Sequence, residues 1–168
     1  EANDIVNAGE ITSDTVLASN DLENNGKLNA TSSVEVTNIT NAGEITTPTV
    51  KATAELTNAE NATITATNGS VTVGTNLTNS GSMNVVTTNV GGNLNDNGTW
   101  QQTDSTVINF VGTGDQSFTP NDNTSYKTIN VTKTSGTFTA TKDLKAGTIN
   151  LLNATQTTFN GIVQITSL

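Results

Sequence analysis

The sequence predicts an all-β fold, namely a single-stranded right-handed parallel β-helix (β-solenoid) of about nine rungs. Two observations carry this prediction. Aliphatic residues recur every seventeen positions through most of the first hundred residues, and glycines keep the same interval. A unit of that length cannot bury an apolar face by itself, so its copies must stack on one another. The composition agrees, because Thr and Val suit half-buried strands while Asn and Gly suit close-set turns.

Six copies of the repeat align on an aliphatic position, with the fourth step lengthened by four: Ile5, Leu22, Ile39, Leu56, Leu77 and Leu94. Two places later each copy has an amide, or finally an acid: Asn7, Asn24, Asn41, Asn58, Asn79 and Asp96. Alternate residues of a strand share a face, so this column should also point inward and form an asparagine ladder with a spacing of about 4.8 Å. A glycine column follows at the predicted corner: Gly9, Gly26, Gly43, Gly81 and Gly98.

Beyond the corner a second inward column is expected at Ile11, Leu28, Ile45, Ala62, Met83 and Trp100. A third wall is expected at Val16 with Ala18, Val34 with Val36, Val50 with Ala52, Val71 with Val73, and Thr88 with Val90. Three walls predict a roughly triangular coil.

Local departures from the repeat predict local irregularities. The third-wall pair of the second copy comes one place late, which predicts a bulge between Ala30 and Ser33. The four extra residues of the fourth copy predict a turn around Asn68-Gly69. Glu10, Lys27 and Glu44 follow successive corner glycines, and their alternating charges should help to set the register.

After Trp100 the interval widens. Phe118, Phe138 and Phe159 are twenty and twenty-one residues apart, and similar intervals separate Ile129 from Ile149, Val131 from Leu151, and Leu144 from Ile165. We therefore expect one continuous domain over 1–168, with seventeen-residue rungs in 1–100, transition loops in 101–125 and rungs of 20–21 residues in 126–168. Both ends read as strands without a polar cap, which predicts part of a longer chain or filament.

Composition excludes several functions. The net charge is −9 and the only cations are six lysines, so neither nucleic acid nor an anionic membrane surface is an expected partner. No apolar run is long enough for membrane insertion. His and Cys are absent, and four acids near the transition, Asp96, Asp104, Asp115 and Asp122, stand in turn-like contexts. We predict no catalytic, cofactor-binding or metal-ligating residue, no cofactor and no enzymatic activity.

Two further functions rank behind a structural one. A polysaccharide-active β-helix needs a carboxylate pair, or a basic residue with Ca²⁺-binding acids on one face, and the candidate acids are few. An ice-binding face needs Thr pairs stacked on successive rungs. Thr63, Thr65 and Thr67 suggest such pairs, as do Thr137, Thr139 and Thr141. The expected column is broken, however, since it contains Thr12, Asn29, Thr46, Thr63, Asn84 and Gln101.

The repeated L-x-N-x-G-x-L pattern resembles the rungs of filamentous-haemagglutinin-like exoproteins. It also resembles other surface β-helix passenger proteins that bacteria export by type V secretion, through an autotransporter or a two-partner system. It occurs as Leu22-Glu-Asn-Asn-Gly-Lys-Leu28 and Ile39-Thr-Asn-Ala-Gly-Glu-Ile45. Phe110-Val-Gly-Thr-Gly-Asp-Gln-Ser-Phe118 is similar to a motif of long bacterial surface β-helix proteins. The resemblance implies an extracellular or cell-surface location and adhesion to host or sister cells, matrix or carbohydrate. It carries over no binding residue.

From the sequence we therefore expect a non-enzymatic structural and adhesive segment of a bacterial adhesin, built as a rigid shaft. The alternative is a self-assembling subunit of an extracellular filament or sheath, in which the ends of the rod associate with those of neighbouring copies.

Overall fold

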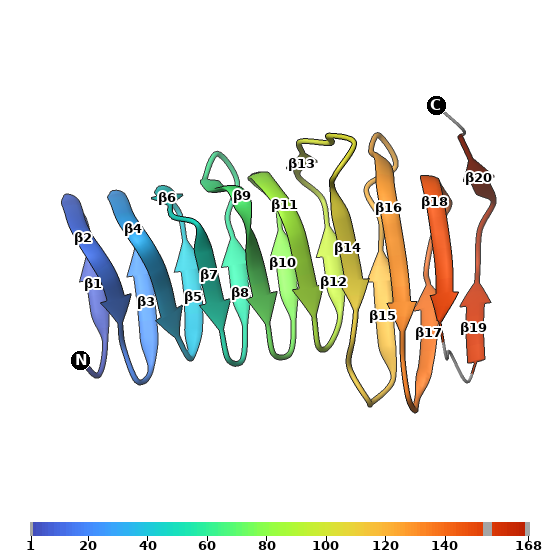
Figure 1. Cartoon of the computed structure of the whole chain (residues 1–168), viewed down its shortest axis with the longest axis horizontal. Helices are drawn as coiled ribbons and strands as arrows, with labels where there is room; N and C mark the ends of the chain where they lie inside the picture. Colours follow the sequence, from blue (N-terminus) through green and yellow to red (C-terminus); the bar gives the residue numbers. More distant parts are fainter. Residues whose placement is uncertain (1, 153–155, 167–168) are drawn as a thin grey trace.

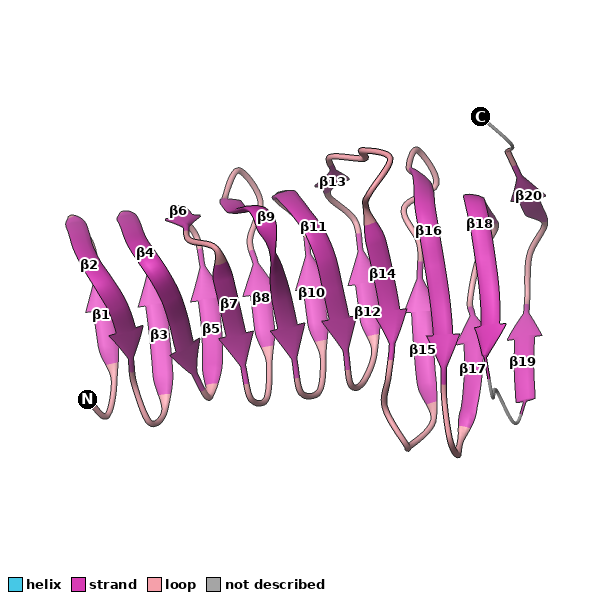
Figure 2. Ribbon diagram, viewed as in Figure 1, coloured by secondary structure: helices cyan, strands magenta, loops and turns pink. Residues whose placement is uncertain are grey.

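The computed structural model describes residues 2–152 and 156–166. Every regular element in these ranges is a β-strand, and the strands pair in parallel (Figure 2). Figure 1 shows two layers of strands along one axis. As the chain advances from left to right the nearer strands run downward and the farther ones upward, which makes a right-handed coil. The solenoid has about 8 turns of roughly 19 residues each.

The strands form two sheets, here called the first and the second sheet. The first sheet has, in spatial order, β1 (Ile5–Asn7), β3 (Asp21–Asn24), β5 (Asn38–Asn41), β8 (Leu56–Asn58), β10 (Leu77–Asn79), β12 (Leu94–Asp96), β15 (Gln116–Thr119), β17 (Thr137–Ala140) and β19 (Gln156–Phe159).

The second sheet has β2 (Glu10–Leu17), β4 (Lys27–Val36), β6 (Glu44–Thr46), β9 (Thr63–Val73), β11 (Ser82–Val90), β14 (Val107–Phe110), β16 (Ser125–Thr132), β18 (Leu144–Leu152) and β20 (Val163–Ile165). Two shorter strands complete it: β7 (Thr49–Ala52) pairs with β4 and β9, and β13 (Thr99–Trp100) pairs with β11.

The seventeen-residue register is confirmed. The aliphatic column stacks in order from Ile5 through Leu22, Ile39, Leu56 and Leu77 to Leu94. The last five of these side chains are no more than 1% exposed. Burial of this column and its neighbours between the two sheets supplies the hydrophobic stabilisation that a single coil lacks.

The glycine corner is a close approach of backbone to backbone. A Cβ built on Gly26 would overlap the carbonyl oxygen of Gly9, and one built on Gly43 would overlap that of Gly26. The next position confirms the expected charge column, since Lys27 lies in register between Glu10 and Glu44, and its Nζ lies 3.5 Å from Glu44 Oε2. Both side chains of this ion pair are more than half exposed, so it adds little stability.

The long fourth step differs from the prediction in one respect. Its four extra residues are divided between two places, so Ile64, not Ala62, fills the second inward column between Ile45 and Met83. One widened corner contains Asn61 and the other bend contains Asn68, and both have a positive φ, of 65° and 59°. In place of the predicted turn, Asn68-Gly69 forms an irregularity within β9, which accounts for half of the insertion. Asn tolerates this left-handed conformation better than most residues.

The predicted second and third walls belong to one sheet, the second sheet, so the three predicted walls form two sheets. The chain turns within a strand at a bulge. Ser13 pairs with Ala30 but Thr15 pairs with Ser33, which places an irregularity between Ala30 and Ser33 as predicted. A similar shift lies between Val85 and Thr87. A bulge lets a strand bend without leaving the ladder of hydrogen bonds.

The wider rungs follow the predicted interval in one part of the second sheet, between β16 and β18, where Ile129 stacks on Ile149 and Val131 on Leu151. On the first sheet the phenylalanines do not form one column. Phe118 pairs with Ala140, which pairs with Phe159, whereas Phe138 pairs with Gln116. The expected Leu144–Ile165 pair is also wrong, because Leu144 pairs with Val163. Loops of unequal length on the two sides of a coil shift the register of one sheet relative to the other.

Candidate functional site

The predicted asparagine ladder runs through the interior beside the glycine corner, and we call it the inner ladder. Each amide Nδ2 donates a hydrogen bond to the side-chain oxygen of the next member, at 2.7 to 2.9 Å, from Asn7 as far as Asp96. The same nitrogens donate to a backbone carbonyl of the following coil, as Asn41 does to Thr63. Both amide donors are thus satisfied, which offsets the cost of burying a polar group.

The inner ladder ends at Asp96, which is fully buried in β12. Its carboxylate accepts hydrogen bonds from Asn79 Nδ2, from the backbone N–H of Gly98, and from Tyr126 Oη at 2.5 Å. Tyr126 Oη in turn accepts from the backbone N–H of Asn121. An ionised carboxylate only accepts, so it can end a chain of donors without leaving one unpaired.

Burial dominates the electrostatics of this pair. Desolvation raises the pKa of Asp96 above its usual value, although the hydrogen bonds from Tyr126, Asn79 and Gly98 oppose the shift. Desolvation and the neighbouring carboxylate also raise the pKa of Tyr126. Asp96 is therefore a buried strand residue and not the turn-forming acid that its neighbours in the sequence suggest.

A groove of about 600 Å³ lies over the corners of consecutive coils, above this end of the inner ladder. Parts of residues 60–63, 80–82, 97–102 and 121–125 line it, and most of the lining side chains are uncharged and polar. Trp100 contributes to the wall but is only 5% exposed, which confirms the expected packing of its ring in the inward column. Its indole Nε1 has no hydrogen-bond partner among the described residues.

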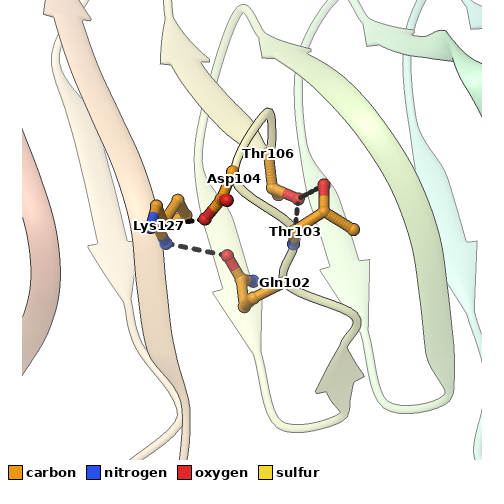
Figure 3. Close-up of polar contacts among 5 residues, drawn as sticks. All are labelled: Gln102, Thr103, Asp104, Thr106 and Lys127. Carbon is orange, nitrogen blue, oxygen red and sulfur yellow. Dashed lines mark hydrogen bonds and ion pairs between the residues drawn. The ribbon is translucent and has the colours of Figure 1, made fainter. Parts of the chain in front are cut away.

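One wall of the groove is stabilised by contacts of the loop that contains residues 101–106, shown in Figure 3. Gln102 Oε1 accepts from the backbone N–H of Lys127 at 2.7 Å, and Lys127 Nζ lies 2.9 Å from Asp104 Oδ1. Thr106 Oγ1 accepts from the backbone N–H of Thr103 within the loop. The hydrogen bond and the charge of Lys127 hold the pKa of Asp104 below its usual value. These contacts fasten the loop to β16.

The Gly112-Thr-Gly-Asp-Gln116 segment surrounds a buried cation that sequence reasoning missed. Lys133 is fully buried, and its Nζ donates to the backbone carbonyls of Gly112 and Gly114 and to Gln116 Oε1, at 2.6 to 2.9 Å. Three acceptors match the three donors of an ammonium group. Burial nevertheless lowers the pKa of Lys133. The arrangement fixes the loop and presents no unpaired group for chemistry.

The four acids considered as candidates are not brought together as a catalytic set. Asp96 ends the inner ladder, Asp104 pairs with Lys127, and Asp115 accepts from the backbone N–H and the hydroxyl of Thr137. Asp122 is exposed. Across residues 2–152 and 156–166 no three carboxylates approach closely enough to hold a metal ion, and no helix is long and apolar enough to cross a membrane.

A second amide ladder lies on the outside of the second sheet, and we call it the outer ladder. Asn150 donates to Asn130, Asn130 to Asn109, and Asn109 to Asn89, each from Nδ2 to Oδ1 at 2.8 Å. The outer ladder was not among the sequence predictions, although its members recur at intervals of twenty and twenty-one residues. The outward column considered for ice binding contains Thr65 in place of Thr63 and remains a mixture of Thr and Asn.

Comparison of the chain with protein-family models, with curated proteins and with solved structures found no match. The class that the fold defines is a parallel β-solenoid with two amide ladders.

Proposed function

We propose that the chain is a non-enzymatic, rigid shaft segment of a bacterial adhesin displayed on the cell surface or secreted. The main support is the unbroken parallel pairing of both sheets along the described chain, reinforced by the inner ladder over the first half and the outer ladder over the second. In the described part of the chain, backbone hydrogen bonds join neighbouring strands of both sheets, and the amides of one ladder or the other join the coils from Asn7 to Asn150. Such a stack resists bending because any bend must stretch hydrogen bonds on one side.

The two ladders overlap, which adds to this support. Asn79 of the inner ladder lies on the same coil as Asn89 of the outer ladder. Asp96 lies on the next coil, which also contains Asn109. Where the inner ladder ends, aromatic rings fill the wider interior. Phe110 packs against Phe118 and Phe138, with ring centroids 5.3 and 4.7 Å apart, and Phe118 packs edge-on against Tyr126. The transition between narrow and wide coils is thus packed and does not form a hinge.

Spin-label distance measurements test the rigidity. The chain contains no cysteine, so Val6→Cys with Thr139→Cys introduces the only two labelling sites, both on the outer face of the first sheet. Seven strand steps separate β1 from β17, which predicts a distance of about 34 Å at the usual strand spacing. We expect one narrow distance distribution. A broad or bimodal distribution, with the circular dichroism of the unlabelled chain retained, would contradict a rigid shaft.

Any adhesive contact made by this segment itself is best placed in the groove, because the groove is a hollow of about 600 Å³ in which several polar side chains converge. We infer a neutral oligosaccharide as its ligand, since the lining is mainly hydroxyls and amides. Trp100 is the only tryptophan, so its indole N–H gives a single resonance. That resonance should shift when cell-wall or matrix oligosaccharides are added. An unchanged spectrum throughout would remove the groove from the proposal.

Self-assembly remains the second candidate function because of exposed apolar side chains on the last described coils. Leu151, Leu152, Ile162 and Ile165 are each about half exposed or more. A covering coil, from this or another copy, would bury them. Sedimentation velocity over a hundredfold range of concentration, equivalent to about 2.7 kcal/mol of association free energy, distinguishes the two. Concentration-dependent growth supports a filament, and a constant monomer supports the shaft.

A further inference from the structure

The outer face of the second sheet carries a regular two-dimensional set of side chains, which we call the outward array. Its middle column is the outer ladder. One flanking column, two residues earlier on each strand, stacks in register as Thr87, Val107, Thr128 and Thr148. The other flank, two residues later, includes Val111, Thr132 and Leu152. The strands β11, β14, β16 and β18 that carry the array lie side by side on the nearer face in Figure 1.

The spacing of the outward array follows from its register. Neighbours in one column are one strand apart, about 4.8 Å, and neighbours on one strand are two residues apart, about 6.6 Å. The lattice is therefore nearly rectangular. The lattice of water oxygens on a prism face of ice is also rectangular, with repeats comparable to these two.

The outer ladder makes the array rigid before any ligand arrives. Each internal amide, such as Asn109 or Asn130, donates one N–H and accepts one hydrogen bond along the column at 2.8 Å. One N–H and one lone pair of each amide remain for an outside partner. Because the side chains already hold one conformation, binding costs little further entropy.

The charge distribution restricts the partner. The chain has fifteen acids and six lysines, yet no residue of the outward array is charged. Lys127, next to Thr128, pairs with Asp104, and Lys133, next to Thr132, is buried. Lys51, two strands beyond Asn89 in the same column, pairs with Glu35. The flanking columns instead present the methyl groups of Thr, Val and Leu, with Val111 46% and Leu152 51% exposed. A neutral surface whose polar groups repeat in two dimensions fits this combination, whereas a charged partner does not.

We propose that the outward array binds ice. Its amides and hydroxyls would replace water molecules at lattice positions, and the methyl groups between them would order the water that joins the protein to the crystal. A crystalline polysaccharide is the other flat, neutral partner, but the array has no aromatic ring to stack on sugar rings. The inference is independent of the proposed shaft function, because a spacer need not bind ice.

The test compares two Thr→Lys variants. Thr128→Lys places a long charged side chain in the outward array, and Thr57→Lys makes the same change on the outer face of the first sheet. Neither threonine side chain makes a hydrogen bond that the core needs, so both variants should keep the circular dichroism and melting temperature of the parent. The measurements are thermal hysteresis, inhibition of ice recrystallisation, and incorporation of fluorescently labelled protein into a growing ice shell.

We expect the parent and Thr57→Lys to separate the melting and freezing temperatures and to enter the ice. Thr128→Lys should lose about tenfold or more of this activity, equivalent to about 1.4 kcal/mol of binding free energy. Thr148→Lys should repeat the loss on the adjacent strand. Exclusion of the parent from ice, equal losses in Thr128→Lys and Thr57→Lys, or binding to chitin or cellulose powder without binding to ice would each overturn the proposal.

Discussion

The inner ladder should contribute measurably to stability, and Asn41→Ala tests this at its middle. Asn41 accepts from Asn24 at 2.8 Å and donates to Asn58 at 2.9 Å, and all three residues are fully buried. The substitution leaves one donor of Asn24 and the side-chain oxygen of Asn58 without these partners. An unsatisfied buried group costs about 1 to 3 kcal/mol, so the expected loss is about 4 kcal/mol of unfolding free energy.

Two matched variants decide whether the ladder causes the loss. Asn7→Ala removes one ladder bond and not two, so it should cost about half as much as Asn41→Ala. Asn25→Ala removes an exposed hydrogen bond to Glu23, two residues earlier in the chain, and should change the free energy of unfolding by no more than about 0.5 kcal/mol. Urea unfolding followed by circular dichroism and by Trp100 fluorescence measures all three.

The loss of unfolding free energy should be largest for Asn41→Ala, intermediate for Asn7→Ala and smallest for Asn25→Ala. If Asn41→Ala came within about 1 kcal/mol of Asn25→Ala, the amide bonds would be interchangeable with solvent and the ladder argument would fail. Solenoids do not always unfold in one step, so the two probes must agree before one free energy is assigned.

Other outcomes follow from the same structure. Leu56→Ala should lose about 2 to 5 kcal/mol, because a fully buried side chain leaves a cavity; a loss below about 1 kcal/mol in urea unfolding would contradict the stacked core. Gly26→Ala should lower the melting temperature strongly, since its Cβ would overlap the backbone of Gly9, whereas Gly9→Ala meets no atom and should be tolerated; equal effects would refute the corner packing. The raised pKa of Asp96 means that the folded state holds this proton more tightly than the unfolded state. The resulting stabilisation is complete below the unfolded pKa of about 4 and lost as the pH rises through the folded value. The unfolding free energy of the parent relative to Asp96→Asn should therefore fall from pH 3 toward pH 7, and a rise would show the opposite shift.

The repeat was readable from the sequence because neighbouring coils stack in register. Leu22 and Ile39 share a column since the same interval separates every feature of their coils. The same logic placed the bulge between Ala30 and Ser33, where one pair comes late. It failed at Ala62, because an insertion can be divided between two bends and the sequence shows only its total length. Asn61 and Asn68, the two positive-φ residues, mark the bends.

The site was less accessible to such reasoning. The repeat placed Asp96 in the inward column, but no such interval described the surroundings of Asp104, Asp115 and Asp122, and nothing in the sequence indicated that Tyr126 would contact Asp96. The outer ladder, by contrast, left a regular interval that a search for outward columns could have found. The inward columns are easier to recognise in a sequence, because their apolar residues define a core.

By itself, the sequence determined that this chain is a stacked β-solenoid with an internal line of amides, because interactions between residues one coil apart repeat at a constant interval. Only the tertiary structure decided that Tyr126 closes the inner ladder on Asp96, that Lys133 is enclosed by the glycine loop, and which phenylalanines stack. These contacts join segments through loops of unequal length, and the register across such loops depends on how the whole coil packs.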